Sequence, residues 1–172
     1  MLRLLRTTTR RALPPRLAVS TLDAAKLEIT RCATNATPPA NDALVGQWGR
    51  IFSPHMLTVD WTVENGWATP VIEPHTDLRL SPAAMALHYA LQCFEGMKAY
   101  RGEDDQIRLF RPELNATRMT SSLERLAMPT FDQAQFVELL KRFVAVESAW
   151  VPRGEGHSMY LGPTCIATDP FL

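Results

Sequence analysis

The sequence has few cysteines and no long apolar run. Its three cysteines, Cys32, Cys93 and Cys165, are scattered along the chain, and no C-x-x-C pair occurs. This pattern excludes a disulfide-rich scaffold and gives no support to a zinc site, so we expect buried or inert thiols in a reducing compartment and no metal. Because no run of about 18 apolar residues exists, the sequence predicts no membrane-spanning helix and no membrane partner.

An excess of charge of either sign is also lacking, since 18 basic residues stand against 18 acidic ones. A basic surface that would favour nucleic acid as a partner is therefore not expected. Neither G-x-G-x-x-G nor G-x-x-x-x-G-K-S/T is present, which removes the usual signals for dinucleotide or P-loop nucleotide binding.

The balanced charge hides an asymmetry at the N-terminus. The first 22 residues contain five arginines and no acidic residue. This composition predicts a mitochondrial presequence over residues 1–30 and a location in the matrix, with a disordered basic tail as the alternative. Residues 31–43 are small, polar and proline-bearing, which predicts an extended linker. We expect the folded domain over residues 44–172.

Hydrophobic spacing predicts helices alternating with hairpins. A helix is expected from Ser81 to Gly96, with Leu87 and Phe94 on its buried face and Tyr89 off that face. A hairpin is expected from residues 97–100 and 107–111. Another hairpin is expected from a strand at 55–61 and a second strand from Trp67 onward, through a type I′ turn at Asn65-Gly66. A single strand is expected over residues 159–167.

Two further helices follow from proline and capping signals. Pro112 opens one helix, in which Met119 and Leu123 lie on an apolar stripe and Arg118 lies off it. Asp132 caps the other, with Gln135 completing a capping-box-like arrangement. The whole pattern predicts an α+β domain with hairpins, an antiparallel sheet and about three helices.

Four blocks carry a resemblance to a known family. They are LHYALQCFEGMKAYRG at 87–102, RLFRPELNATRM at 108–119, FSPHMLTVDW at 52–61 and SMYLGPT at 158–164. In this order and spacing they resemble the branched-chain amino acid aminotransferases, which are fold type IV enzymes dependent on pyridoxal 5'-phosphate. The resemblance implies the small N-terminal domain of that fold.

The resemblance also implies roles for individual residues. Arg118 matches the position that binds the coenzyme phosphate, a role that suits a permanently charged planar guanidinium. Tyr89, Phe94 and Tyr160 match positions that surround the aliphatic side chain of the substrate. The pattern alone favours a solvated helix arginine at position 118 and a core residue at Phe94, and it is the resemblance that gives them these roles.

The sequence departs from the family in two respects. The family usually reads Tyr-x-Arg-Pro where this chain has Tyr160-Leu161-Gly162-Pro163, and that arginine helps to accept the distal carboxylate of 2-oxoglutarate. The chain also has only three lysines, Lys26, Lys98 and Lys141. The reacting lysine of the family lies in a C-terminal domain, so we expect a fragment that contains no catalytic residue and is inactive by itself.

These observations leave hypotheses of different classes. The first is a transaminase acting on leucine, isoleucine or valine with 2-oxoglutarate, with amino and 2-oxo acids as ligands and a homodimer as the full-length form. The second is a non-catalytic fragment that binds a partner subunit. A third keeps the fold type but changes the reaction, to that of a D-amino acid aminotransferase or aminodeoxychorismate lyase.

Overall fold

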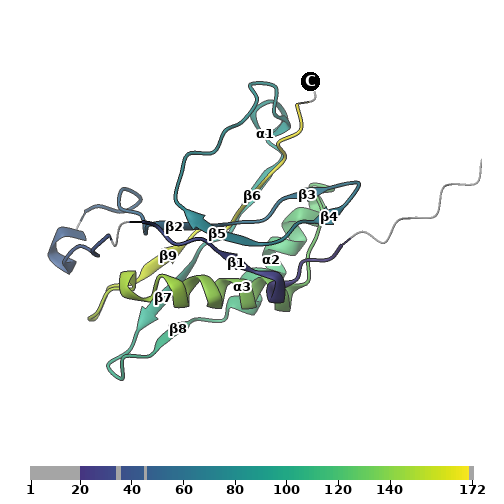
Figure 1. Ribbon diagram of the computed structural model, residues 1–172. Helices are drawn as coiled ribbons and strands as arrows, with labels where there is room; N and C mark the ends of the chain where they lie inside the picture. The colour runs from purple at the N-terminus through teal and green to yellow at the C-terminus, as the bar shows by residue number, and fades with distance from the viewer. Residues whose placement is uncertain (1–19, 34–35, 45, 171–172) are drawn as a thin grey trace, which may run out of the picture.

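The computed structural model describes residues 20–33, 36–44 and 46–170. Figure 1 shows two long helices packed beneath several small sheets, with a projection that carries a third, short helix. The α-helices are α1 (Met85–Tyr89), α2 (Pro112–Arg125) and α3 (Gln133–Val146). The described part of the chain therefore confirms the predicted α+β class with about three helices. No helix within it is long and apolar enough to cross a membrane.

Within the described residues, ten short strands form four small sheets. Their bounds are β1 (Glu28–Ile29), β2 (His55–Thr58), β3 (Trp61–Thr62), β4 (Gly66–Trp67), β5 (Val71–Pro74), β6 (Gln92–Phe94), β7 (Met97–Arg101), β8 (Ile107–Leu109), β9 (Met159–Leu161) and β10 (Thr164–Ile166). The orders are β1-β5-β2, β8-β7-β9, β10-β6 and β3-β4. All described pairs between these strands are antiparallel except β1 with β5.

The hairpin and the two long helices confirm the local sequence signals. β7 and β8 pair across a turn, with Ala99 opposite Leu109. On α2, Met119 and Leu123 are buried while Arg118 is exposed. Asp132 caps α3 by accepting a hydrogen bond from the Gln135 backbone N–H at 3.0 Å. Gln135 does not complete a capping box, because its side-chain oxygen accepts instead from the Ala24 backbone N–H at 2.8 Å.

Two packed clusters hold the helices against the sheets. One joins β7 and β9 to α3 through Met97, Ala99, Leu140, Val144, Val151 and Leu161. The other joins residues 22–24 to α3, where Leu22 and Ala24 pack on Leu139. β1 pairs with β5 just after this contact. The packed structure thus includes residues that precede the expected boundary at residue 44, whereas residues 1–19 of the predicted presequence lie outside the described part.

The prediction of one helix from Ser81 to Gly96 is wrong. The helix is limited to the five residues of α1, and Ala90 follows it in the left-handed region with a φ of 53°. Leu87 and Phe94, expected on the buried face, are 62% and 72% exposed. The chain leaves the helix because residues 92–94 pair with β10, a contact between distant segments that helical spacing does not reveal.

Two smaller predictions are also corrected. The strand expected over 159–167 is divided into β9 and β10 at Gly162-Pro163, where proline has no backbone N–H to continue a ladder. The turn between β3 and β4 is not type I′. That turn needs positive φ at both central residues, and only Gly66 of the Asn65-Gly66 pair has it, at 75°.

Candidate functional site

Two bends face each other at the centre of the site. Glu95 and Gly96 separate β6 from β7, and Gly162 and Pro163 separate β9 from β10. β6 pairs with β10 and β7 pairs with β9, so the bends are opposite one another. The Glu95 backbone N–H donates to the Pro163 carbonyl at 2.9 Å across the gap. The backbone pairing therefore continues across both bends, and Glu95 is held between the β6–β10 pair and the β7–β9 pair.

Tyr160 fits between the glycines of these two bends. A Cβ atom on Gly96 would lie 2.9 Å from the Tyr160 hydroxyl, and one on Gly162 would lie 2.8 Å from the ring carbon Cε1. Both distances are too short, so the ring can hold this position only because neither residue has a side chain. Trp48 contacts the ring edge-on, with the centroids 5.0 Å apart. The position of Tyr160 therefore depends on glycine at both positions 96 and 162.

Glu95 is a buried carboxylate with a complete set of partners. Its side chain is 3% exposed. Arg118 on α2 donates to it through Nε and Nη2, both at 2.6 Å. Asn115, one turn earlier, donates from Nδ2 to the Oε2 atom at 2.9 Å. The hydrogen bonds from Arg118 hold the pKa of Glu95 below its usual value against the opposing effect of burial, so the carboxylate is ionised at neutral pH.

The same contact orients Arg118 toward solvent. A guanidinium has five N–H groups, and the two that meet Glu95 leave three for another acceptor. These three belong to Nη1 and to the outer side of Nη2, the edge suited to a bidentate bond with a phosphate or carboxylate. The Arg118 side chain is 67% exposed. The buried Glu95 carboxylate thus holds the Arg118 guanidinium at the surface with three N–H groups that bond none of the described residues.

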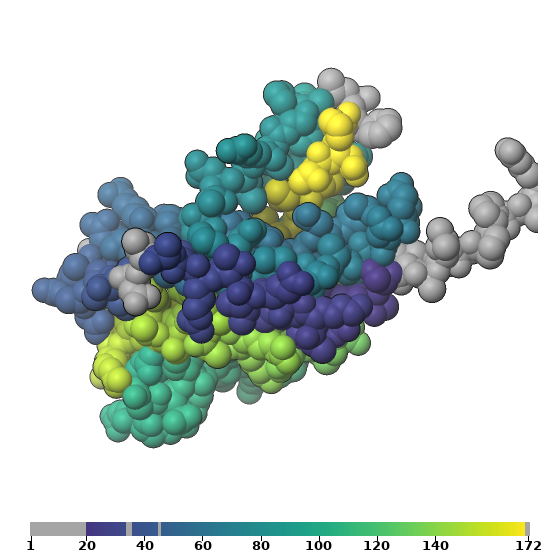
Figure 2. All heavy atoms as spheres, in the orientation of Figure 1, coloured from purple at the N-terminus to yellow at the C-terminus, as the bar shows by residue number. Residues whose placement is uncertain are grey.

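The structure separates the other expected pocket residues. Tyr160 lines a broad groove that passes between the sheets, but Arg118, Tyr89 and Phe94 do not. Tyr89 lies on α1 in the projection and is 55% exposed, and Phe94 on β6 is 72% exposed. Figure 2 shows the surface hollowed between this projection and the rest of the molecule. Arg118 and Tyr160 are therefore brought together around Glu95 and Gly96, whereas Tyr89 lies apart on the projection.

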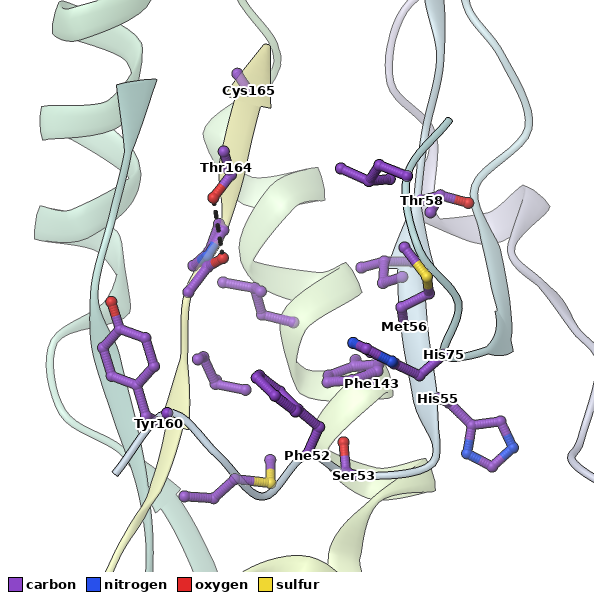
Figure 3. Close-up of a pocket in the computed structure, with 18 of the residues that line it drawn as sticks. Phe52, Ser53, His55, Met56, Thr58, His75, Phe143, Tyr160, Thr164 and Cys165 are labelled. Carbon is purple, nitrogen blue, oxygen red and sulfur yellow. Dashed lines mark hydrogen bonds between the residues drawn. The ribbon is translucent and has the colours of Figure 1, made fainter. Parts of the chain in front are cut away.

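The groove itself is mainly apolar and aromatic. Figure 3 shows Tyr160, Thr164 and Cys165 along one strand wall, with Phe52 and Met56 across from them. Phe52 stacks on His75, with ring centroids 5.2 Å apart. This lining can accept an aliphatic or aromatic group by apolar contact.

Sequence reasoning missed the two residues that organise Arg118. Glu95 lies inside the block at 87–102 without a role of its own in the resemblance, and Asn115 is an uncharged residue on the predicted helix. A single acidic residue between Cys93-Phe94 and Met97 is the available signal, because an acidic residue that is buried among apolar residues needs a partner. Of the three lysines, Lys98 on β7 pairs directly with Tyr160 on β9, and its side chain is exposed. His55 is buried against Glu147 and is also among the residues that line the groove (Figure 3).

Comparison with known proteins gives a consistent set of relatives. No family model matches the chain. It is 46% identical over 161 residues to a branched-chain-amino-acid aminotransferase of Monosiga brevicollis, covering 94% of this chain and 41% of the relative. The chain is homologous to the branched-chain-amino-acid aminotransferases. It is 43% identical to the cytosolic protein of Saccharomyces cerevisiae over 91% of this chain and 41% of the relative. For the mitochondrial protein of Rattus norvegicus, the values are 42%, 95% and 41%.

The chain spans about two fifths of the length of these curated relatives. A solved structure also matches, that of the T.th. branched-chain amino acid aminotransferase complexed with N-(5'-phosphopyridoxyl)-L-glutamate. That match has a TM-score of 0.49 at 21% identity, and it covers 68% of this chain and 34% of the other. The resemblance of the four sequence blocks is thus confirmed by relatives that align along nearly the whole chain.

Proposed function

We propose that this chain contributes the phosphate-anchoring part of a branched-chain amino acid transaminase that depends on pyridoxal phosphate. The whole enzyme would move the amino group of leucine, isoleucine or valine to 2-oxoglutarate. The observation that carries the proposal is the Glu95–Arg118 pair, in which the bonded carboxylate leaves three guanidinium N–H groups for an anion. The identity of 42–46% to aminotransferases over nearly the whole chain supports the same reaction.

Arg118 would bind the coenzyme phosphate with its outer edge, and Glu95 with Asn115 would keep that edge in place. The coenzyme, when bound, supplies the electron sink for chemistry at the substrate α-carbon. Tyr160, which lines the groove, is proposed to contact the aliphatic side chain of the substrate, and apolar burial of about 25 cal/mol per Å² would favour branched side chains over polar ones. Tyr89 and Phe94, to which the resemblance gives the same role, lie outside this groove, so their contact with the substrate stays a prediction. None of the residues in this chain is assigned a catalytic role, so the chain alone should not transaminate.

Gly162 affects the choice of acidic substrate. The family resemblance leads us to expect an arginine there, and glycine offers no cation for the distal carboxylate of 2-oxoglutarate or glutamate. A Cβ at this position would lie 2.8 Å from Tyr160, so Tyr160 takes space that a larger residue would need. We infer that any recognition of that carboxylate comes from a residue other than 162.

Partner binding is the second candidate function. The projection and the start of α2 expose large apolar side chains: Leu87, Tyr89, Phe94, Phe110 and Leu114 are between 55% and 72% exposed. Exposed apolar groups of this size often mark a protein interface, which agrees with a homodimer or with association with a complete subunit. Co-purification with a complete branched-chain aminotransferase tests this, and we expect Leu87→Ser to reduce the yield of the complex.

We also propose that the arginine-rich N-terminus directs the protein to the mitochondrial matrix. Both mitochondrial and cytosolic relatives match the chain, so the support comes from the five arginines among the first 22 residues. Residues 1–30 fused to a fluorescent protein should accumulate in mitochondria. Replacing Arg3, Arg6 and Arg10 with alanine should leave the fusion in the cytosol, and a cytosolic wild-type fusion would contradict the proposal.

Phosphate anchoring is tested by titrating pyridoxamine phosphate into the chain and following its phosphorus NMR signal. Arg118→Ala should weaken binding about 10- to 100-fold, because charge-assisted hydrogen bonds are lost. Arg125→Ala, an exposed arginine of the same helix, is the matched control and should bind like the wild type. Pyridoxamine, which has no phosphate and is followed by its proton NMR signals, should bind equally weakly to all three proteins. Equal affinity of wild type and Arg118→Ala would refute the anchoring role.

A further inference from the structure

Cys93 and Cys165 stand opposite each other at the centre of the β6–β10 pair. The ladder hydrogen bonds on the two sides are Glu95 N–H to the Pro163 carbonyl at 2.9 Å and Ala167 N–H to the Leu91 carbonyl at 3.0 Å. Hydrogen-bonded positions recur at every second residue of an antiparallel pair, which makes Cys93 and Cys165 a hydrogen-bonded pair with a typical Cα separation of about 5.5 Å.

This register brings the two sulfur atoms to the same face of the sheet, because directly paired residues of an antiparallel ladder project to one side. The Cα separation falls within the range of about 4.4–6.8 Å found in disulfides. The Cβ atoms of a hydrogen-bonded pair lie near about 5.5 Å, which exceeds the roughly 3.5–4.5 Å of a disulfide, so the bond requires the two strands to approach by about 1 Å and should be readily reduced. Both thiols are partly exposed, and Cys165 lines the groove beside Thr164 (Figure 3). Cys93 lines a second, smaller hollow with Phe94 and Thr164, from which a small oxidant can reach it.

The third cysteine provides a contrast. The Cys32 thiol donates to the Pro54 carbonyl at 3.1 Å, and its backbone N–H donates to Nε2 of His55 at 3.0 Å. These partners place Cys32 beside β2, in a different sheet from β6 and β10. It is thus a free thiol in the same chain that lacks the paired geometry.

We propose that Cys93 and Cys165 are an oxidation site, forming an intrachain disulfide when the chain meets a small disulfide such as oxidised glutathione. The inference rests on the β6–β10 register and is independent of the proposed transaminase function. It also revises the expectation that all three thiols are inert.

The reaction is a balanced exchange in two steps. The Cys93 thiolate attacks one sulfur of the oxidant, whose S–S bond breaks and releases one glutathione thiolate, which takes up a proton. The Cys165 thiol then loses its proton and attacks the Cys93 sulfur of the mixed disulfide, expelling the second glutathione. Two cysteine thiols are oxidised by two electrons, and one glutathione disulfide is reduced to two thiols.

Cys93 is the better first nucleophile of the pair. Burial raises the pKa of Cys165 to about 12, and the neighbouring Cys93 adds to this effect. Burial also raises the pKa of Cys93, with the negative charge of Glu95 adding to it, but a hydrogen bond from Cys165 opposes the shift. Both thiols are mostly protonated at neutral pH, so the site is expected to oxidise slowly, as a shielded pair rather than as a reactive thiol.

The test uses the full chain, fully reduced and then incubated with oxidised glutathione. Free thiols are blocked with N-ethylmaleimide, and the products are analysed by intact mass and by peptide mapping without reductant. We expect a monomer that carries one N-ethylmaleimide, on Cys32, and lacks two hydrogen atoms, and one crosslinked peptide pair that contains Cys93 and Cys165. Dithiothreitol added before the blocking step should give a chain with N-ethylmaleimide on all three cysteines.

Three serine variants make the result specific. Cys32→Ser should still form the disulfide at the wild-type rate. Cys93→Ser should lose it, and Cys165→Ser should instead retain a stable glutathione adduct on Cys93. Circular dichroism confirms that each variant is folded, and the wild-type mapping decides the question without any variant. A disulfide that involves Cys32, a crosslink between chains, or free Cys93 and Cys165 after prolonged incubation at about pH 8 to 9, where more thiolate forms, would overturn the proposal.

Discussion

Two buried glutamates show how the same side chain can serve different ends. Glu95 and Glu147 are 3% and 1% exposed. Glu147, at the end of α3, pairs with Nδ1 of His55, which is itself 8% exposed. Because Nε2 of His55 accepts the Cys32 N–H, that nitrogen carries no proton, and Nδ1–H donates to Glu147. All the partners of Glu147 lie inside the structure, so this pair joins β2 to α3 and offers nothing to a ligand.

Glu95 differs in the exposure of its partner. Arg118 is 67% exposed and retains three N–H groups, whereas His55 has both ring nitrogens engaged. Glu95 also has both oxygens bonded, but the Oε2 atom of Glu147 has no partner among the described residues. A fully bonded carboxylate behind an exposed cation is an arrangement for binding an anion. The buried His55–Glu147 pair instead has a structural role, since it connects β2 to the end of α3.

The largest expected loss of stability comes from removing the buried His55–Glu147 pair. Glu147→Ala removes a fully buried side chain and leaves the His55 N–H without an acceptor, so unfolding free energy should fall by about 3 kcal/mol. Urea denaturation measures this. Glu138→Ala, which loses an exposed pair with Arg142 on the same helix, should change it by less than about 0.5 kcal/mol. Similar values for the two variants would contradict the distinction.

The stability of the two facing bends should depend on the space that Gly162 leaves for the Tyr160 ring. Gly162→Ala places a Cβ 2.8 Å from the Tyr160 ring, and forcing the ring aside should cost about 1–2 kcal/mol. In a Tyr160→Ala background the same substitution should cost almost nothing, a coupling that a double-mutant cycle measures by urea unfolding. Equal costs in both backgrounds would show that Tyr160 is not what Gly162 accommodates.

Asn115 should have a smaller effect that is confined to the Glu95 region. Its amide donates to Glu95 Oε2 at 2.9 Å and to the Gly96 carbonyl at 3.2 Å. Asn115→Ala should therefore lower the unfolding free energy by about 1 kcal/mol. Ser122→Ala, whose hydroxyl donates to the Arg118 carbonyl at 3.1 Å within α2, is the comparison and should lower it by less. The idea fails if the order is reversed.

The smallest expected effect is a pH dependence of the stability that Glu95 contributes. The hydrogen bonds from Arg118 hold the pKa of Glu95 in the folded chain below the ordinary value of 4.5. The stabilisation is therefore complete above pH 4.5 and is lost as pH falls through the lower folded value. The difference in unfolding free energy between wild type and Glu95→Gln should shrink over that acidic interval and stay constant above it. A difference that grows on acidification would have the wrong sign.

Local signals predicted much of the fold and only part of the site. The β7–β8 hairpin and both long helices follow from turn, proline and capping residues close in sequence. The pairing of β6 with β10 joins segments about 70 residues apart, and such pairing overrides local propensity. It broke the helix expected through Phe94 and created the two facing bends. Arg118 was found through motif resemblance, whereas Glu95 could be understood only after its buried position was known.

The central claim is that Glu95 positions Arg118 for an anion, and binding of pyridoxamine phosphate to wild type, Glu95→Gln, Arg118→Ala and the double variant tests it most directly. Glu95→Gln removes a negative charge, so simple electrostatics would make an anion bind more tightly. We predict the reverse, a loss of about 3- to 10-fold from the freed guanidinium, and no further loss in the Arg118→Ala background. Tighter binding to Glu95→Gln, or the same change in both backgrounds, would contradict the account.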